Sequence, residues 1–168
     1  HIPVHVLTVS DYADENQCVK FDNKETMYIY RFKKYKLSIL TFVKRIYDIV
    51  CHIKKYHYSH CLLSGRFSLY TSNFIRLISG SIKLIGVLHG SELLTQTNTS
   101  KLLLTKSLKK INAFVSVSKF TDSLIPDNSI NRSNRNIIPN GVNTKIFSKT
   151  VHKKSINIHG NPPLLSVG

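Results

Sequence analysis

The sequence is poor in acidic residues. Nine Asp and Glu stand against 24 Lys and Arg, which gives a net charge of +15 and a pI near 9.9. Five of the nine acids fall between residues 11 and 25, so residues 26–168 carry 22 basic and only four acidic side chains. Such a surface attracts polyanions, whether anionic lipid headgroups, nucleic acid or phosphorylated small molecules. The net charge alone does not distinguish between these three kinds of partner.

Long apolar runs and paired cysteines are also missing. No run approaches the 18 apolar residues of a membrane-spanning helix, and no basic and then hydrophobic signal segment is visible. The three cysteines, Cys18, Cys51 and Cys61, are odd in number and lack metal-binding spacing, which favours reduced thiols over a disulfide framework. We therefore expect a cytoplasmic globular protein.

The common catalytic signatures are absent as well. Neither phosphate-binding fingerprint, Walker A or GxGxxG, occurs, and there is no HExxH, GxSxG or CxxC. The eight histidines are scattered, and none has metal-binding spacing to another ligand. The sequence therefore gives no support for a metal site or for a nucleophile triad.

Apolar segments of strand length alternate with segments of helical periodicity. Residues 10–24 are polar and acidic and are expected to form a loop, as are residues 129–135. The order predicts an α/β, Rossmann-like fold with a mostly parallel sheet and helices on both faces. The predicted strands are 4–9, 27–32, 61–65, 82–88, 113–117 and 136–139, and the predicted helices are 36–57, 70–79, 102–111 and 119–125.

The chain is organised around residues 82–92, where an apolar strand stops at His89-Gly90 and is followed by Ser91-Glu92. A nearly continuous hydrophobic run is typical of a buried parallel strand. Residues beyond its carboxyl end line the crevice in which open α/β sheets bind ligands. His89 and Glu92 are therefore candidates for chemistry, although an ordinary Gly turn explains the same residues.

Three segments together resemble the N-terminal domain of glycosyltransferase family 4, which has the GT-B fold. The first is residues 89–92, His-Gly-Ser-Glu, and the second is residues 113–121, a strand ending in Val-Ser-Val-Ser. The third is residues 136–143, Asn-Ile-Ile-Pro-Asn-Gly-Val-Asn, followed by Phe147. Asn143 stands where the family usually has Asp.

The resemblance also implies a domain division. Residues 1–150 correspond to the acceptor-side Rossmann-like domain without its first strand, and residues 151–163 to an interdomain linker. Residues 164–168, Leu-Leu-Ser-Val-Gly, look like the start of the first strand of a C-terminal donor-binding domain that the sequence lacks. The parent protein is therefore expected to be the enzyme, and this fragment alone to be inactive.

The activity that the resemblance implies is a retaining transfer of sugar from a nucleotide-sugar donor to a glycan or lipid-linked acceptor, with no metal or other cofactor. His89 and Glu92 are the expected catalytic residues, with Glu92 either orienting a sugar hydroxyl or capping the following segment. The expected substrate-binding residues are Gly90, Ser91, Ser118, Thr121, Asn140 and Gly141, although a helix cap explains Ser118 and a tight turn explains the last two.

The predicted helix 36–57 is amphipathic and basic, and such a helix can dock on an anionic membrane surface. Its apolar positions, from Ile39 to Ile53, recur at three- and four-residue steps. The plainer alternative is a helix packed on the sheet with a solvated basic face. Membrane docking would place the protein peripherally at the inner face of the cell membrane. The residues expected to dock are Lys33, Lys34, Lys36, Lys44, Arg45, Lys54 and Lys55.

Two other classes compete with an enzyme. The charge also fits a non-catalytic binding module for polyanions, either nucleic acid or an anionic membrane. No RNP, KH, zinc-finger or helix-turn-helix signature supports specific nucleic-acid binding. The third class is an inactive remnant of a transferase.

Overall fold

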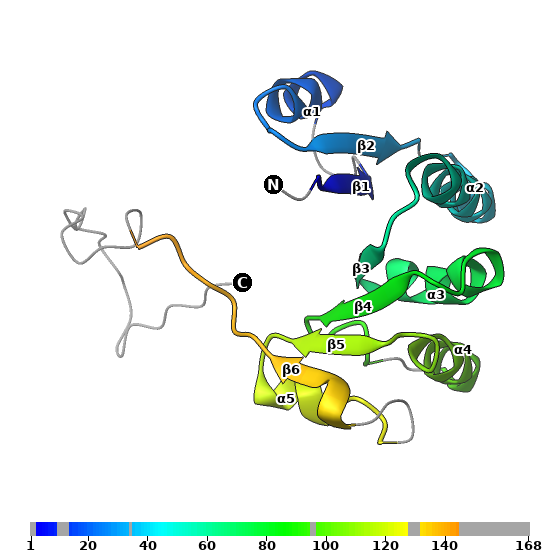
Figure 1. The fold of residues 1–168 in the computed structure, drawn as a ribbon, viewed down its shortest axis with the longest axis vertical. Helices are drawn as coiled ribbons and strands as arrows, with labels where there is room; N and C mark the ends of the chain where they lie inside the picture. Colours follow the sequence, from blue (N-terminus) through cyan, green and yellow to red (C-terminus); the bar gives the residue numbers. More distant parts are fainter. Residues whose placement is uncertain (1–2, 10–13, 34, 95–96, 128–131, 145–168) are drawn as a thin grey trace, which may run out of the picture.

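The computed structural model describes residues 3–9, 14–33, 35–94, 97–127 and 132–144 (Figure 1). Strands and helices alternate along them, so the predicted α/β class is confirmed. In chain order the elements are β1 (His5–Val9), α1 (Glu15–Asp22), β2 (Tyr28–Phe32), α2 (Ser38–Tyr56), β3 (His60–Ser64), α3 (Arg66–Ile78), β4 (Lys83–Leu88), α4 (Asn98–Leu108), β5 (Ala113–Ser116), α5 (Lys119–Ser123), a 3-10 turn (Arg132–Asn134) and β6 (Arg135–Ile137).

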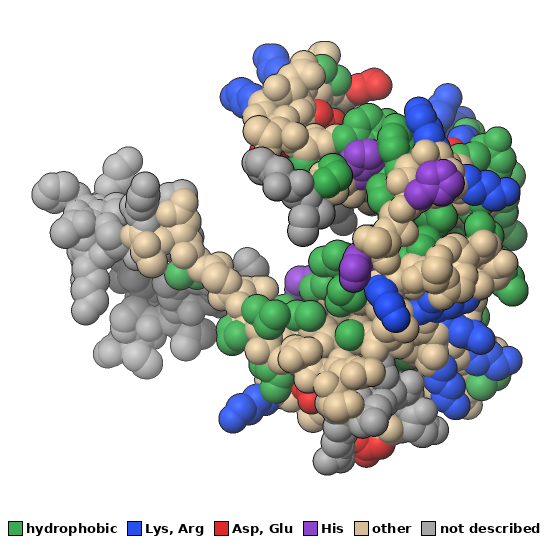
Figure 2. Space-filling view, in the orientation of Figure 1, with side chains coloured by type: hydrophobic (Ala, Val, Ile, Leu, Met, Phe, Trp, Pro, Cys, Tyr) green, Lys and Arg blue, Asp and Glu red, His purple; other side chains and the backbone are tan. Residues whose placement is uncertain are grey.

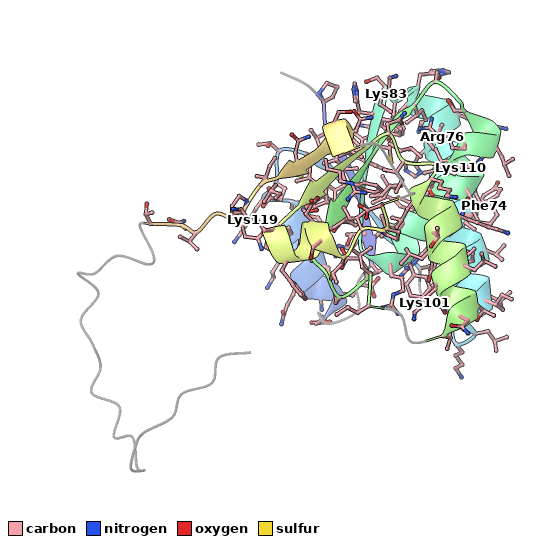
Figure 3. All side chains as sticks on the ribbon, turned by 90° about the horizontal axis from the view of Figure 1, so that it is seen from below. Phe74, Arg76, Lys83, Lys101, Lys110 and Lys119 are labelled. Atoms are coloured by element: carbon pink, nitrogen blue, oxygen red, sulfur yellow. The ribbon has the colours of Figure 1, made fainter. Side chains whose placement is uncertain are left out.

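All described strand pairs are parallel, but they form two sheets rather than one. One sheet has the order β1-β2 and the other β3-β4-β5-β6. Helices α2, α3 and α4 form one layer, and α5 lies across the strands from α4 (Figures 1 and 3). The absence of a first strand from residues 1–150 stays a prediction, and residues 151–163 and 164–168 lie outside the described part.

The prediction of a loop over residues 10–24 is wrong in its second half, where α1 forms. The helix begins with Glu15, an acid that suits the positive end of the helix dipole, and its one buried residue is Cys18. The Asp22 carboxylate accepts two hydrogen bonds from the Arg31 guanidinium of β2, at 2.6 and 2.8 Å. These bonds lower the pKa of Asp22. A helix with one buried apolar residue gives too weak a periodicity to be read from sequence.

The core lies between the four-stranded sheet and the layer of α3 and α4. Leu69 and Ile75 of α3 meet Leu84 and Leu88 of β4 there, and all four are fully buried or nearly so. Phe114 of β5 is also fully buried and is the register partner of Gly86 in β4. A Cβ on Gly86 would lie 2.6 and 2.8 Å from two ring carbons of Phe114. The Phe114 ring therefore occupies the space that a side chain at position 86 would need.

Arg76 of α3 ties the start of β4 to the turn before β5. Its guanidinium donates to the carbonyls of Gly80 at 3.0 Å, Ile82 at 2.7 Å and Lys110 at 2.9 Å, and to the side chain of Asn112. The Asn112 side chain in turn accepts the Leu84 N–H at 2.8 Å. Figure 3 shows Arg76 close to Lys83 and Lys110 at this end of the sheet.

We expect Gly86→Ala to lower the free energy of unfolding by about 1–3 kcal/mol, because the new methyl group overpacks the core against Phe114. Urea denaturation of the purified chain measures the change. Gly80→Ala is the matched control, since a Cβ there meets no atom within 4 Å. Equal stability of the two variants would contradict this account of the core.

The cysteine environments predict one reactive thiol. All three cysteines are free; Cys51 is exposed on α2, and Cys18 is buried. Burial raises the pKa of the Cys61 thiol to about 11, so it stays protonated and unreactive at neutral pH. We expect an aromatic disulfide reagent to label one thiol rapidly, and Cys51→Ser to remove this fast phase. A fast phase that survives the substitution would place the reactive thiol elsewhere.

Candidate functional site

The carboxyl ends of β3, β4 and β5 bring together residues that are distant in sequence. Parallel register pairs Ser64 with Val87 and Leu88 with Ser116, so the residues that follow these strands lie at one edge of the sheet. His89 is exposed there, directly after β4. Its Nε2 lies 3.3 Å from the Ser64 hydroxyl. Sequence analysis placed His89 at this edge but did not identify Ser64.

The turn after His89 is built around the buried carboxylate of Glu92, which is 4% exposed. One oxygen accepts the His89 backbone N–H at 2.6 Å, and the other accepts the Ser91 hydroxyl at 3.4 Å. The Leu93 N–H also donates to the Gly90 carbonyl at 3.0 Å and closes the turn. Of the two roles expected for Glu92, this geometry favours capping.

Gly90, Ser118 and Thr121 form the support beneath this turn. Gly90 has φ +110°, a conformation that other residues rarely adopt, and a Cβ there would lie 3.2 Å from the Thr121 hydroxyl. That hydroxyl donates to the His89 carbonyl at 3.4 Å and accepts from Ser118 at 3.1 Å. Ser118 also caps α5 by accepting the Thr121 N–H. Because Thr121 is 2% exposed, its side chain holds the turn from inside.

Arg66, the first residue of α3, clamps the same turn from the neighbouring strand end. Its guanidinium donates to the carbonyls of Ser91 at 2.9 Å and Leu94 at 3.4 Å. Arg66 follows Gly65, whose φ of +80° turns the chain sharply between β3 and α3. Sequence analysis missed Arg66, although the strand that ends at Ser64-Gly65 resembles the strand that stops at His89-Gly90.

The other residues predicted to bind substrate make fewer contacts with the turn that carries His89. Ser91 is exposed at the turn, whereas Asn140 and Gly141 lie in the exposed stretch after β6. No hydrogen bond in the described ranges joins Asn140 or Gly141 to His89. Their role in substrate binding stays a prediction.

Only some of the residues predicted to dock on a membrane are exposed and uninvolved in contacts within the fold. Arg45 stacks over the rings of Phe32 and Phe67, each 5.8 Å from its guanidinium carbon, and Lys44 pairs with the buried Asp48. Lys34 lies outside the described residues. The exposed members of the predicted set are Lys33, Lys36, Lys54 and Lys55.

The prediction that α2 packs through an apolar face and exposes a basic one is wrong for its first half. Ile39 and Val43 are exposed, whereas Thr41 and Asp48 are buried. The inward polar groups are satisfied, since Asp48 accepts a hydrogen bond from the Tyr30 hydroxyl at 3.1 Å. Thr41 bonds to the backbone of Tyr35.

Neither a metal cluster nor a membrane span is found in the described ranges. No three His, Cys, Asp or Glu side chains there lie together in a way that could hold a metal ion. None of the helices described is both long and apolar enough to cross a membrane. Transfer without a metal stays a prediction.

Comparison with known proteins supports the fold and no finer assignment. No protein-family model and no curated protein matches the sequence. The structure of UDP-N-acetylglucosamine 2-epimerase from Rickettsia bellii is similar, with a TM-score of 0.53 and 7% identity. The match covers 81% of this chain but 44% of that one. This confirms the predicted Rossmann-like, GT-B-type fold class, whereas membership of glycosyltransferase family 4 stays a prediction.

We expect Glu92→Ala to lower the free energy of unfolding by about 1–3 kcal/mol, because the His89 N–H loses its acceptor. Glu92→Gln is the matched comparison, since its carbonyl oxygen can still accept that N–H, and we expect a smaller loss. Urea denaturation measures both. Equal losses would show that the negative charge, and not the acceptor, stabilises the turn.

Proposed function

We propose that the protein to which this chain belongs transfers a sugar, with retention, from a nucleotide-sugar donor to a glycan or lipid-linked acceptor. The observation that carries the proposal is His89, an exposed imidazole at the carboxyl end of β4 whose turn is held by the buried Glu92. The similar fold of an enzyme named for UDP-N-acetylglucosamine supports a nucleotide sugar as ligand. The match covers 44% of that enzyme, so the activity proposed is that of the whole protein.

The His89 ring is suited to bind a hydroxyl of the transferred sugar. Its Nε2 faces the Ser64 hydroxyl, while no described residue is hydrogen-bonded to its Nδ1. A serine hydroxyl can donate or accept, so the Ser64 contact is compatible with either tautomer of the His89 ring. The ring can thus present a donor or an acceptor to the sugar as positive charge develops at the anomeric carbon.

The remaining groups of the site position the substrates. The leaving group is a nucleoside diphosphate, and the reaction needs the donor and acceptor aligned and the developing charge stabilised. The bare Gly90 backbone allows close approach of a ligand, and the exposed Ser91 next to it offers a hydroxyl group. We propose no resident metal and no catalytic proton transfer for Glu92, because both of its oxygens bond within the turn.

An anionic membrane is the proposed site of a lipid-linked acceptor. The excess of basic side chains after residue 26 supports it. The same charge supports the alternative of a non-catalytic polyanion-binding module, which shows itself by salt-dependent binding of oligonucleotides without turnover.

We expect His89→Ala to lower the rate of sugar transfer by the full-length protein on the order of 100-fold, because the sugar loses a preorganised hydrogen bond. Release of nucleoside diphosphate from a panel of nucleotide sugars, with and without acceptor, measures the rate. His60→Ala is the matched control, since His60 is an exposed histidine at the opposite end of β3. Undiminished transfer in His89→Ala, or epimerised sugar in place of transfer, would refute the proposal.

A further inference from the structure

An exposed apolar ridge runs along the first half of α2. Ile39 is 70% exposed, Val43 58% and Tyr47 62%, and their spacing of four residues places them on one stripe together with the half-exposed Leu40. We call these four residues the α2 ridge. Its span of eight residues corresponds to about 12 Å along the helix.

The inward contacts of α2 fix the outward direction of the ridge. Asp48 is bonded to the Tyr30 hydroxyl of β2, and Arg45 stacks over Phe32 of the same strand. Turning the ridge inward would expose these contacts and leave the Asp48 carboxylate without its partners. The exposed apolar stripe is therefore a property of how the helix is held.

The apolar surface continues onto α3. Phe42 of α2 packs against Phe67 and Phe74, with ring centroids 6.3 and 6.1 Å apart, and Phe67, Phe74 and Leu77 are themselves exposed. Figure 2 shows hydrophobic side chains among Lys and Arg over this α2–α3 layer, along its right-hand side. Contiguous apolar surface of this kind marks a protein or membrane interaction site.

The part of the chain that carries the ridge is strongly basic. Residues 33–110 contain 14 basic and two acidic side chains, and both acids, Asp48 and Glu92, are buried. Exposed lysines flank both ends of the ridge, with Lys33 and Lys36 before it and Lys54 after it. The partner must therefore offer negative charge at its surface and apolar groups beneath.

We propose that the α2 ridge inserts into the headgroup region of an anionic phospholipid bilayer, with the flanking lysines on the lipid phosphates. A second copy of the chain fits less well, because its own lysines would face the same positive rim. Nucleic acid offers phosphates but no apolar layer for Ile39, Leu40 and Val43. The inference rests on the α2 ridge, the adjoining surface of α3 and the flanking lysines, and it stands or falls separately from the chemistry at His89.

Flotation of the full chain with vesicles tests the proposal. We expect binding to phosphatidylcholine vesicles that contain phosphatidylglycerol and much weaker binding to phosphatidylcholine alone. The double variant Ile39→Glu, Val43→Glu removes two inserting side chains, and we expect its partition coefficient to fall roughly tenfold or more. Since both positions are exposed, thermal unfolding should be unchanged within error.

Val19→Glu is the matched control. Val19 is 52% exposed on α1, near the acidic part of the chain, so the same kind of substitution there should leave vesicle binding unchanged. Equal binding to both vesicle types, or equal losses in the double variant and the control, would overturn the proposal. A dimer without vesicles that the double variant dissociates would overturn it too, since a second copy would then cover the ridge. His89→Ala should bind vesicles normally whether or not it transfers sugar.

Discussion

The parallel register of β3, β4 and β5 is the constraint on which the site depends. It places Ser64, His89 and Ser118 at the same edge of the sheet, although 54 positions separate the first from the last. The register is held from within by Phe114 over the bare backbone of Gly86 and at the opposite edge by Arg76. The geometry of the exposed histidine thus follows from packing well inside the core.

Within the site, the backbone is held more firmly than the histidine ring. Glu92 accepts the His89 N–H, and Thr121 donates to the His89 carbonyl. Arg66 donates to the Ser91 carbonyl. The ring itself has one hydrogen-bond partner among the described residues, Ser64. A fixed turn that carries a side chain with few hydrogen bonds of its own is preorganised for a ligand, because the entropic cost of ordering the loop is met during folding.

The sequence predicted the parts of this arrangement that depend on local pattern. The apolar run before His89 and the Gly after it were sufficient to place the candidate histidine at a strand end. Ser64 and Arg66 were not predicted, because their contacts join segments 25 or more residues apart and depend on strand register. Helix α1 was missed for a related reason, since its stability depends on one buried cysteine and on the Asp22–Arg31 pair with β2.

Helix α2 shows why periodicity alone does not orient a helix. The apolar stripe was found correctly, but a stripe has the same period whether it faces the sheet or the surroundings. The direction is set by the contacts of Asp48 with Tyr30 and of Arg45 with Phe32. Since Tyr30 and Phe32 belong to β2, these contacts cannot be read from the helix sequence alone. In the first half of α2, polar groups bonded on the inside leave Ile39 and Val43 outside, whereas Ile53 in the second half lies in the core. The ridge shares no residue with the carboxyl edge of the sheet, so attachment to a surface through α2 uses none of the groups that hold His89.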